Sequence, residues 1–261
     1  MKRIPITPAL DVYPLEFRAL LTKGGVWDSS CSPEARVLFL DCDNGYYLKS
    51  SPKGTLAQEA EMARYFHKKG LGAEVLSYLS LEQDWLLTSR VAGEDATHAR
   101  YLEDPVRLCE TTAGLLRRLH SLDFSDCPVQ DRNASYCKTA EQNWCLGRFD
   151  QTLFPDGWGY HTKEDAWRAI EQGRGELKRE VLLHGDYCLP NVMLNDWSFS
   201  GFIDLGNGGV GDRHIDLFWG AWTLNFNLKT DAYTDRFLDA YGRKDVDLEK
   251  LKLIAAFEMF G

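Results

Sequence analysis

Three polar side chains follow apolar runs in the second half of the chain, at a spacing suited to binding a metal ion and phosphate. In "LLHGDYCLPNVM", residues 182–193, Asp186 and Asn191 are separated by four residues. Asp204 follows in "SGFIDLG", after a gap of eight residues. An Asp, four residues and an Asn, with Asp-x-Gly downstream, is the layout of a phosphotransferase catalytic loop and metal loop.

The residue types fit that chemistry. Phosphoryl transfer requires that the charge on the β- and γ-phosphates of ATP be neutralised, and Mg²⁺ does this through hard oxygen ligands. The amide oxygen of Asn191 and the carboxylate of Asp204 are such ligands. Asp186 is expected to accept a hydrogen bond from the attacking hydroxyl and to orient it. His184 is expected to be a buried histidine that braces the loop.

A structural interpretation of the same residues exists. Asp186 then forms a turn, Asn191 lies in a loop, and Asp204 caps a helix or turn. We prefer the chemical interpretation because the whole pattern, from the His-Gly-Asp to the Asp-x-Gly, is far more specific than any one of its parts.

The first part of the chain is expected to bind the nucleotide. Lys49 lies at the end of a predicted strand, residues 45–50, and would contact the α- and β-phosphates. Glu59, in the first turns of a predicted helix at 55–70, is its expected partner, with Glu61 as the alternative. A Gly-x-Gly-x-x-Gly loop is missing. That place is occupied by Ser29, Ser30 and Ser32. They could donate hydrogen bonds to a phosphate, or they could form an ordinary polar turn.

The elements that must position these residues fall into two parts. Residues 1–90 read mainly as strands with one helix, including a hairpin whose strands, 36–41 and 45–50, meet at Asn44-Gly45. Thr55 and Gln58 suggest a capping box for the helix at 55–70, and Gly70 ends it. A linker at 89–95 follows.

Residues 91–261 read as mainly helical. Asp104 and Pro105 begin a helix at 104–123, and further helices are predicted at 163–179, 212–228, 231–242 and 247–260. Residues 124–180 are otherwise hard to assign. Short strands flank the catalytic loop. The sequence therefore predicts a bilobal α+β fold, with a β-rich nucleotide-binding lobe at 1–90 and a catalytic and substrate-binding lobe at 91–261.

Composition narrows the class of partner. With 30 basic and 39 acidic residues, the chain has a net charge of −9, which disfavours nucleic acid and suits a cationic small substrate. The charge could also serve solubility alone. No apolar run is long enough to span a membrane, and the first residues lack the apolar part of a signal peptide. Seven cysteines without a Cys-x-x-Cys pair suggest reduced thiols in the cytoplasm.

The sequence resembles the aminoglycoside 3′-phosphotransferases, antibiotic-resistance kinases with a protein-kinase-like fold. The resemblance covers nearly the whole chain and is weakest over 124–180. It rests on the segments "HGDYCLPNVM", "FSGFIDLGNGGVGDRHIDL", "RFLDAYG", "LRRLHSLDFSDCP" and "YYLK".

The resemblance implies roles for residues that match the family's motifs. Asp186 would be the catalytic aspartate, Asn191 and Asp204 would hold magnesium, and Lys49 and Glu59 would form the phosphate-positioning pair. The remaining matches concern the nucleotide. They are Tyr47, which would stack on adenine, Ser32 in the nucleotide loop, and Ser89 to Val91, whose backbone would pair with adenine.

The implied substrate is a polycationic aminoglycoside bound by acidic residues. Glu258 matches such an acid, and Asp231 and Asp156 are further candidates. Relatives often end on a phenylalanine whose terminal carboxylate contacts the drug, whereas here Gly261 follows Phe260. Asn207 stands where many relatives have arginine, and the aromatic-rich segment 216–228 is bulkier than expected, although a core helix face explains it.

These departures leave other functions open. The alternative is a kinase of another small alcohol, such as choline, a sugar or a different antibiotic. A non-catalytic nucleotide-binding protein is a more remote possibility, because all three chemical residues are present. A protein kinase is disfavoured because no activation segment with an Ala-Pro-Glu end follows Asp204.

Overall fold

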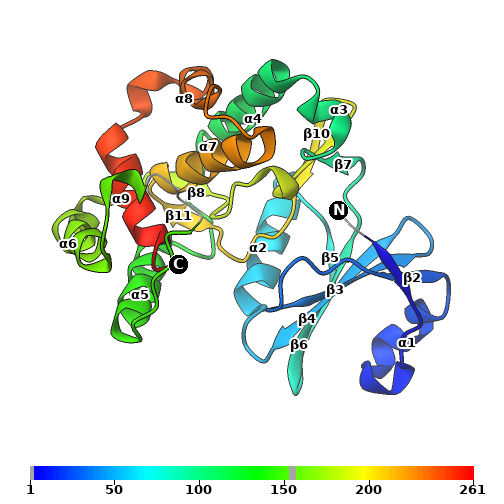
Figure 1. Ribbon diagram of the computed structural model, residues 1–261. Helices are drawn as coiled ribbons and strands as arrows, with labels where there is room; N and C mark the ends of the chain where they lie inside the picture. Colours follow the sequence, from blue (N-terminus) through cyan, green and yellow to red (C-terminus); the bar gives the residue numbers. More distant parts are fainter. Residues whose placement is uncertain (1–2, 153–156) are drawn as a thin grey trace. The chain divides into compact units, whose positions relative to one another are not determined.

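The computed structural model describes residues 3–152 and 157–261, and the chain divides into two compact units. Unit 1 consists of residues 1–95 and 190–206, and unit 2 of residues 96–189 and 207–261. Figure 1 shows the elements of each unit. The sequence had assigned residues 190–206 to the second lobe, whereas they belong by their contacts to the first unit. The division into a nucleotide-binding and a substrate-binding lobe stays a prediction.

Unit 1 is built on a six-stranded antiparallel sheet with the strand order β1-β2-β3-β4-β6-β5 (Figure 1). Lys49 lies in β4, between Val37 of β3 and Leu86 of β6. The strands are β1 Ile4–Ile6, β2 Gly25–Asp28, β3 Arg36–Asp41, β4 Tyr46–Pro52, β5 Val75–Ser80 and β6 Gln83–Ser89. The 3₁₀ helix η1 (Leu10–Val12) and helix α1 (Leu15–Leu21) connect β1 to β2.

Alternation along β4 decides which side chains reach the core. Leu48 is buried in a cluster with Phe17 of α1 and Trp85 of β6. Because successive side chains of a strand point to opposite faces, Tyr47 and Lys49 project from the other face. The face that carries Lys49 also carries Leu86, its partner in β6, which packs with Leu56 and Ala60 at the start of α2.

Helix α2 (Ala57–Lys68) carries Glu59 and begins in a way that the sequence did not reveal. The predicted cap at Thr55 is wrong: the N-cap is Leu56, whose own side chain makes no capping hydrogen bond. Its backbone N–H instead donates to the carboxylate of Asp84, at 2.9 Å. The predicted end is confirmed, since Gly70 follows the helix with a positive φ of 70°.

The second part of unit 1 is a small sheet of β9 (Val192–Asn195), β10 (Ser198–Phe202) and β7 (Glu94–Asp95). Phe202, at the end of β10, packs edge-on against Phe66 of α2, with ring centroids 6.2 Å apart. The backbone N–H of Phe202 donates to the carbonyl of Leu71 at 2.7 Å. These contacts fix residues 203–206 beside the helix that carries Glu59.

Unit 2 is mainly helical, with a two-stranded antiparallel sheet of β8 (Val181–Leu183) and β11 (Gly209–Gly211). Its helices are α3 Ala99–Leu102, α4 Pro105–His120, α5 Arg132–Cys145, α6 Lys163–Gly173, α7 His214–Leu228, α8 Thr234–Tyr241 and α9 Leu248–Glu258. The 3₁₀ helices η2 (Gly157–Gly159), η3 (Arg174–Glu176) and η5 (Arg243–Asp245) connect them, and η4 (Leu189–Asn191) ends at unit 1.

Several of these helices were predicted and one was missed. The cap of α4 is confirmed, because the Asp104 carboxylate accepts the backbone N–H of Arg107, at 3.2 Å. Helix α6 ends before residue 179, which the sequence had included. Helix α5 lies in the region that resisted assignment, and Asp131 caps it.

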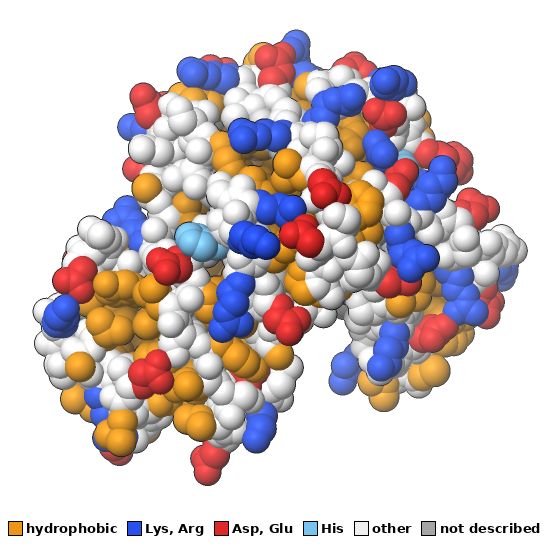
Figure 2. Space-filling model, turned by 180° about the vertical axis from the view of Figure 1, so that it is seen from behind, with side chains coloured by type: hydrophobic (Ala, Val, Ile, Leu, Met, Phe, Trp, Pro, Cys, Tyr) orange, Lys and Arg blue, Asp and Glu red, His pale blue; other side chains and the backbone are white. Residues whose placement is uncertain are grey.

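The described part of the chain contains no helix long and apolar enough to cross a membrane. Figure 2 shows acidic and basic side chains interspersed on one face of the molecule. The α+β fold class that the sequence predicted, with a sheet-rich first part and a helical second part, is confirmed.

Candidate active site

In unit 1, Lys49 lies between two carboxylates. Its ammonium nitrogen Nζ lies 3.0 and 2.8 Å from the two oxygens of Glu59 and 2.8 Å from Oδ1 of Asp204. The side chain of Lys49 is 19% exposed and that of Asp204 is 52% exposed. Glu61, the alternative partner, is exposed. Strand β4 and helix α2 therefore bring Lys49 and Glu59 together, and the loop after β10 adds Asp204, which lies 155 residues after Lys49.

The charge of Lys49 is secured by this arrangement. Burial alone would lower the pKa of its ammonium group, but the carboxylates of Glu59 and Asp204 outweigh burial and raise that pKa above its ordinary value. The lysine is therefore a permanent cation at neutral pH. A fixed ammonium group of this kind can bind a phosphate oxygen.

Asn191 and Asp204 lie on neighbouring segments of unit 1. The backbone N–H of Ile203 donates to the carbonyl of Asn191 at 3.1 Å, and Asn191 is buried. Asp204 has a φ of 60°, in the left-handed region that few residues other than glycine adopt. Strained backbone of this kind is concentrated at functional sites. The side-chain amide oxygen of Asn191 and the carboxylate of Asp204 are ligands of the kind that Mg²⁺ prefers.

The residues matched to adenine binding are on β4, β6 and the segment after β6. The ring of Tyr47 packs on Phe39, with centroids 5.2 Å apart, and its hydroxyl accepts a hydrogen bond from Arg3 at 2.8 Å. The backbone N–H of Ser89 donates to the carbonyl of Glu74 at 2.9 Å. Val91 is buried. Their roles with adenine stay predictions.

The serine-rich turn before β3 is closed by its own hydrogen bonds. Ser29 donates its backbone N–H to the carbonyl of Val37 at 2.8 Å, and the hydroxyl oxygen of Ser30 accepts the N–H of Val37 at 3.0 Å. Ser32 is exposed. The turn thus has an ordinary structural basis, and a contact between Ser32 and phosphate stays a prediction.

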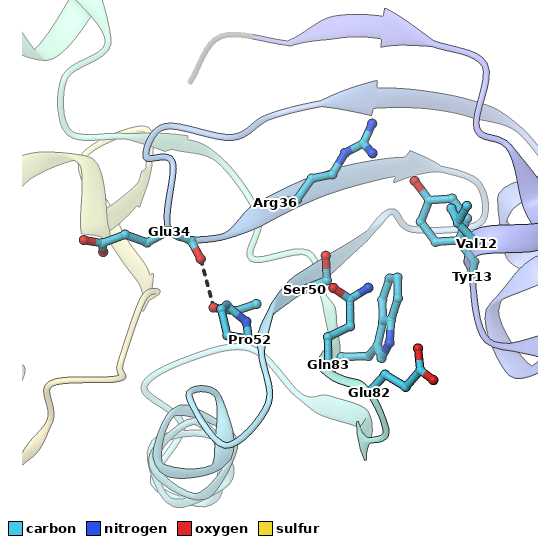
Figure 3. A pocket seen from close by; sticks show the side chains of 10 residues that line it. Val12, Tyr13, Glu34, Arg36, Ser50, Pro52, Glu82 and Gln83 are labelled. Atoms are coloured by element: carbon cyan, nitrogen blue, oxygen red, sulfur yellow. Dashed lines mark hydrogen bonds between the residues drawn. The ribbon is translucent and has the colours of Figure 1, made fainter.

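A hollow of about 510 Å³ in unit 1 does not coincide with these residues. Figure 3 shows Arg36, Ser50 and Gln83 among the side chains that line it. Ser50 neighbours Lys49 in β4 and therefore points to the opposite face of the sheet. None of the predicted site residues is among its lining residues, so within the described chain we assign this hollow no part in the chemistry.

In unit 2, Asp216 holds the backbone of the catalytic loop. Its two carboxylate oxygens accept the backbone N–H groups of His184 and Gly185, each at 2.8 Å. Asp216 lies in the first turn of α7 and is fully buried. Gly185 has a φ of 85°, and a Cβ there would lie 1.8 Å from the carbonyl oxygen of Asn207. Only glycine fits at this turn, which leads directly to Asp186.

A buried network extends from Asp216. Nε2 of His120 lies 3.1 Å from a carboxylate oxygen of Asp216, and Nδ1 of His120 lies 2.9 Å from the hydroxyl of Tyr241. Burial lowers the pKa of His120, so its ring is neutral. The ring then donates through Nε2 to Asp216 and accepts the tyrosine hydroxyl at Nδ1. Oδ2 of Asp216 thus accepts hydrogen bonds from both the His120 ring and the backbone N–H of His184, which holds the carboxylate in place.

The loop around Asp186 is also held locally. His184 is fully buried, and its Nδ1 lies 3.3 Å from the backbone nitrogen of Asp186, so the expectation that it braces the loop is confirmed. The carbonyl of Asp186 accepts the N–H of Cys188 at 2.8 Å. Burial, reinforced by the Asp186 carboxylate, raises the pKa of the Cys188 thiol, so this cysteine stays neutral.

Arg132, the first residue of α5, binds the residue that replaces the family's usual arginine. Its Nε donates to the carbonyl of Asn207 at 2.8 Å and its Nη2 to the side-chain oxygen at 2.9 Å. Because Asn207 in turn lies against Gly185, the guanidinium group supports the back of the catalytic turn. Arg132 thus places a cation beside the residue at position 207.

Glu258, the matched substrate acid, lies at the end of α9. One of its carboxylate oxygens accepts hydrogen bonds from the hydroxyl of Tyr136 at 2.7 Å and from the indole N–H of Trp219 at 2.9 Å. Burial raises the pKa of Glu258 to about 7, because it outweighs these two hydrogen bonds; the nearby Asp186 carboxylate also raises it. This carboxyl group therefore titrates near neutral pH.

The remaining substrate candidates are less informative. Asp231 is exposed between α7 and α8. Phe260 is buried among Trp144, Phe149 and Trp167, and its carbonyl accepts a hydrogen bond from Asn143. Asp156 lies outside the described residues. Roles for these three in binding a substrate stay predictions.

Sequence reasoning missed Asp216 and Arg132. Asp216 stands in "DRHIDL", part of a segment on which the family resemblance rests, and an acid in the first turn of a helix is a usable signal. No local signal marked Arg132, because it acts on a residue 75 positions away.

A separate acidic and histidine cluster is a structural ion-pair network. Glu180, Asp212 and His214 lie close enough to hold a metal ion. However, Nδ1 of His214 is hydrogen-bonded to Asp212 at 2.6 Å, and its Nε2 accepts the backbone N–H of Asp247 at 2.9 Å. Both ring nitrogens are therefore engaged, which leaves no lone pair for a metal.

The family model and the most similar relatives that we compared all indicate a phosphotransferase. The model of the phosphotransferase enzyme family matches residues 32–254. The chain is 48% identical over 253 residues to "Probable aminoglycoside 3′-phosphotransferase" of Lactococcus lactis subsp. lactis (strain IL1403), covering 97% of this chain and 96% of that protein. It is 29% identical to "Aminoglycoside 3′-phosphotransferase" of Streptomyces fradiae, covering 82% and 85% of the two chains.

A solved structure supports the same assignment. The crystal structure of an aminoglycoside-3′-phosphotransferase of type VIII superposes with a TM-score of 0.73 at 27% identity, covering 90% of this chain and 91% of that one. The matched region includes the loop with Asp186 and Asn191 and the Asp-x-Gly segment at Asp204. The chain therefore belongs to the phosphotransferase enzyme family and shares the kinase-like fold of its aminoglycoside-modifying members.

Proposed function

We propose that this protein is an ATP-dependent kinase that transfers the γ-phosphoryl group of ATP to the 3′-hydroxyl of an aminoglycoside antibiotic. The observation that carries the phosphotransferase assignment is Lys49, held as a cation between Glu59 and Asp204 within unit 1. The choice of substrate is supported by the relatives, which bear the name of that activity. The enzyme would protect the cell that carries it from the drug.

The residues of unit 1 bind and orient the nucleotide. Lys49 contacts the phosphates, and Glu59 keeps its ammonium group in place. Asn191 and Asp204 would hold magnesium, which would neutralise phosphate charge. The ring of Tyr47 offers a face on which adenine can stack. The backbone of Ser89 to Val91, at and after the end of β6, pairs with adenine.

Asp186 acts on the acceptor. It accepts a hydrogen bond from the attacking hydroxyl, orients it in line with the γ-phosphate and takes its proton as the new P–O bond forms and the bond from the γ-phosphorus to the leaving ADP breaks. Asp216 holds the backbone immediately before Asp186, so the carboxylate is positioned before substrate binds. The chain links Asp186 to Asn191 through four residues, so their Cα atoms can be no more than ~18 Å apart.

The acceptor is a small cation. Glu258 offers a carboxylate in unit 2 that can pair with an ammonium group, and the net charge of −9 attracts polycations. The same charge disfavours nucleic acid as a partner. We place the reaction in the cytoplasm, which supplies ATP; the seven cysteines are all free thiols, which fits a reducing compartment.

A coupled assay of ADP release tests the function. Purified protein with Mg²⁺ and ATP is offered kanamycin and neomycin, and the position of the new phosphate is read by NMR. We expect turnover with at least one drug, phosphorylation at the 3′-oxygen, and a loss of about 10³-fold or more in kcat for Asp186→Asn. Removal of Mg²⁺ with EDTA abolishes turnover, and added Mg²⁺ restores it.

The same assay separates the alternative. If neither drug is phosphorylated but choline, a simple sugar or another antibiotic is, the enzyme is a kinase of that alcohol. The observation that keeps this alternative open is the interaction of Arg132 with Asn207. Many relatives have arginine at position 207, whereas here the cation beside the catalytic loop comes from Arg132.

A further inference from the structure

Gln58, in the first turn of helix α2, makes a contact that the proposed chemistry does not use. The capping box that the sequence predicted for it with Thr55 is wrong. Its side-chain Nε2 instead donates to the backbone carbonyl of Gly206, 148 residues further along the chain, at 2.8 Å. Both residues are partly buried, so the surrounding protein shields this hydrogen bond from part of the solvent. The amide of Gln58 is thus engaged with the segment that carries Asp204.

That segment, residues 203–206, which we call the metal loop, is anchored at both of its ends within unit 1. At its start, the backbone N–H of Ile203 donates to the carbonyl of Asn191 at 3.1 Å. At its end, the Gly206 carbonyl accepts the hydrogen bond from Gln58. Between these anchors, Asp204 has its φ of 60°. Backbone in this region persists only where the surrounding structure holds it, which the two anchors do.

The end of the metal loop lies directly against helix α2. A Cβ at Gly206 would lie 3.5 Å from Oε2 and 3.6 Å from Cβ of Glu59. The same carboxylate of Glu59 lies 2.8 Å from Nζ of Lys49. Two consecutive residues of α2 therefore hold the two partners of the site: Gln58 holds the metal loop, and Glu59 holds the lysine. Helix α2 thus fixes the backbone around Asp204 relative to Lys49.

The anchor at Gly206 differs from the ionic contact of Asp204 in carrying no charge. Oδ1 of Asp204 lies 2.8 Å from Nζ of Lys49. This ion pair weakens when the carboxylate also ligates a metal ion, because two cations then share one negative charge. The hydrogen bond from the Gln58 amide to the Gly206 carbonyl joins two neutral groups. It therefore holds the metal loop equally well whichever cation the Asp204 carboxylate faces.

We propose that Gln58 is a positioning residue for Asp204, the residue that we assign to magnesium. By holding the Gly206 carbonyl, Gln58 keeps the metal loop in the backbone conformation from which the Asp204 carboxylate binds the metal ion. This proposal rests on the proposed function. A purely structural role at the start of α2 is the alternative. The helix has another anchor there, since the N–H of Leu56 donates to Asp84, so loss of Gln58 should loosen the metal loop rather than the helix.

The first test measures how much magnesium contributes to nucleotide binding. The dissociation constant of ADP is measured by calorimetry in excess Mg²⁺ and in EDTA, for the wild type and for Gln58→Met, which keeps the length of the side chain but removes its N–H donors. We expect the constant in Mg²⁺ to rise about five- to tenfold, the range that corresponds to one neutral hydrogen bond. The constant in EDTA should stay within about twofold, because Asp204 acts only through the metal.

The matched control is Gln142→Met, the same substitution at an exposed residue of helix α5. It should leave both dissociation constants unchanged. The ratio of the two constants is insensitive to partial unfolding, since inactive protein lowers the number of binding sites and not the affinity of the folded ones.

The second test needs neither nucleotide nor metal. Hydrogen exchange of the backbone amides is compared between the wild type and Gln58→Met. We expect exchange in residues 203–206 to be about fivefold faster or more, while the later turns of α2 exchange at the wild-type rate. A purely structural role would instead speed exchange in α2.

An unchanged ratio of the two dissociation constants, or unchanged exchange in the metal loop, would overturn the proposal. Both measurements are made without an acceptor. Failure of the wild type to phosphorylate any alcohol in the coupled assay would instead overturn the proposed function, so the two failures are distinguishable.

Discussion

Asp216 lies 31 residues after Gly185 in the sequence, yet one of its carboxylate oxygens lies 2.8 Å from the backbone nitrogen of Gly185. The other oxygen accepts the neighbouring N–H of His184. A buried carboxylate that satisfies two backbone donors leaves the loop little freedom, because breaking either hydrogen bond would strand a buried polar group. The position of Asp186, in a loop, is therefore set by a residue of helix α7.

Replacing Asp216 tests this relationship. In Asp216→Asn the new amide must turn one N–H donor toward a group that also donates. We expect a loss of roughly 2–4 kcal/mol in the free energy of unfolding and a fall of about 10²-fold in kcat. Denaturant unfolding and steady-state kinetics measure both. Asp235→Asn, at an exposed carboxylate of α8, is the control and should change neither.

The turn before Asp186 should tolerate only glycine. In Gly185→Ala the added methyl group would lie 1.8 Å from the carbonyl oxygen of Asn207, and the φ of 85° adds strain. We expect a destabilisation of at least about 2 kcal/mol and kcat lowered by about 10²-fold.

A second glycine isolates the steric part of this effect. Gly147 has a φ of 68°, but a methyl group there would meet nothing within 4 Å. Gly147→Ala should therefore cost only the backbone strain, about 1 kcal/mol, and leave kcat near the wild-type value. Equal effects of the two substitutions on stability and kcat would contradict the close contact with Asn207.

Lys49 is expected to act on the nucleotide alone. Lys49→Met should lower kcat/KM for ATP by about 10²-fold, while KM for the aminoglycoside stays within about threefold. The substitution also leaves the carboxylate of Glu59 nearly buried without its lysine, so the melting temperature should fall. Initial rates at varied ATP and varied drug separate the two KM values.

The double variant Lys49→Met with Glu59→Gln removes the stranded carboxylate. It should regain most of the lost melting temperature but none of the activity, because the cation is still missing. Recovery of activity in the double variant would show that Lys49 serves stability rather than phosphate binding.

Glu258 should make drug binding depend on pH. Its pKa of about 7 means that the carboxylate loses its charge as the pH falls from 8 to 6. We expect KM for the aminoglycoside to rise across this range, and KM for ATP to stay constant. Because the drug's amines titrate as well, the informative comparison is with Glu258→Gln, in which the inflection near pH 7 should disappear.

The raised pKa of Glu258 affects stability in the opposite direction: a lower pH weakens drug binding but favours the folded state. In the folded chain the pKa of Glu258 lies above its ordinary value of 4.5, so the stability that this group contributes is present below pH 4.5 and is lost as the pH rises through 7. Relative to the wild type, Glu258→Gln should therefore be more stable at pH 8 than at pH 5. Melting temperatures of both proteins across this range check the sign.

Much of the fold and of the candidate site could be predicted from the sequence, because the signals are local. Strand alternation and the Asn44-Gly45 turn indicated the hairpin that carries Lys49, and helical spacing placed Glu59 on the helix after it. Asp104 and Pro105 marked the start of α4. The spacing of Asp186, Asn191 and Asp204 indicated the chemistry, since few reactions need those oxygen ligands in that order.

Other features were decided only by the tertiary structure. Helix α2 begins where Asp84, 28 residues further along, accepts the N–H of Leu56, which local capping rules could not show. Asp216 and Arg132 support the catalytic loop from other helices. Only packing divided α7 into a side with buried residues, such as Leu217 and Leu224, and a side on which Phe226 is exposed. Sequence patterns report short-range preferences, whereas these contacts arise from long-range packing, which brings together residues that no local pattern connects.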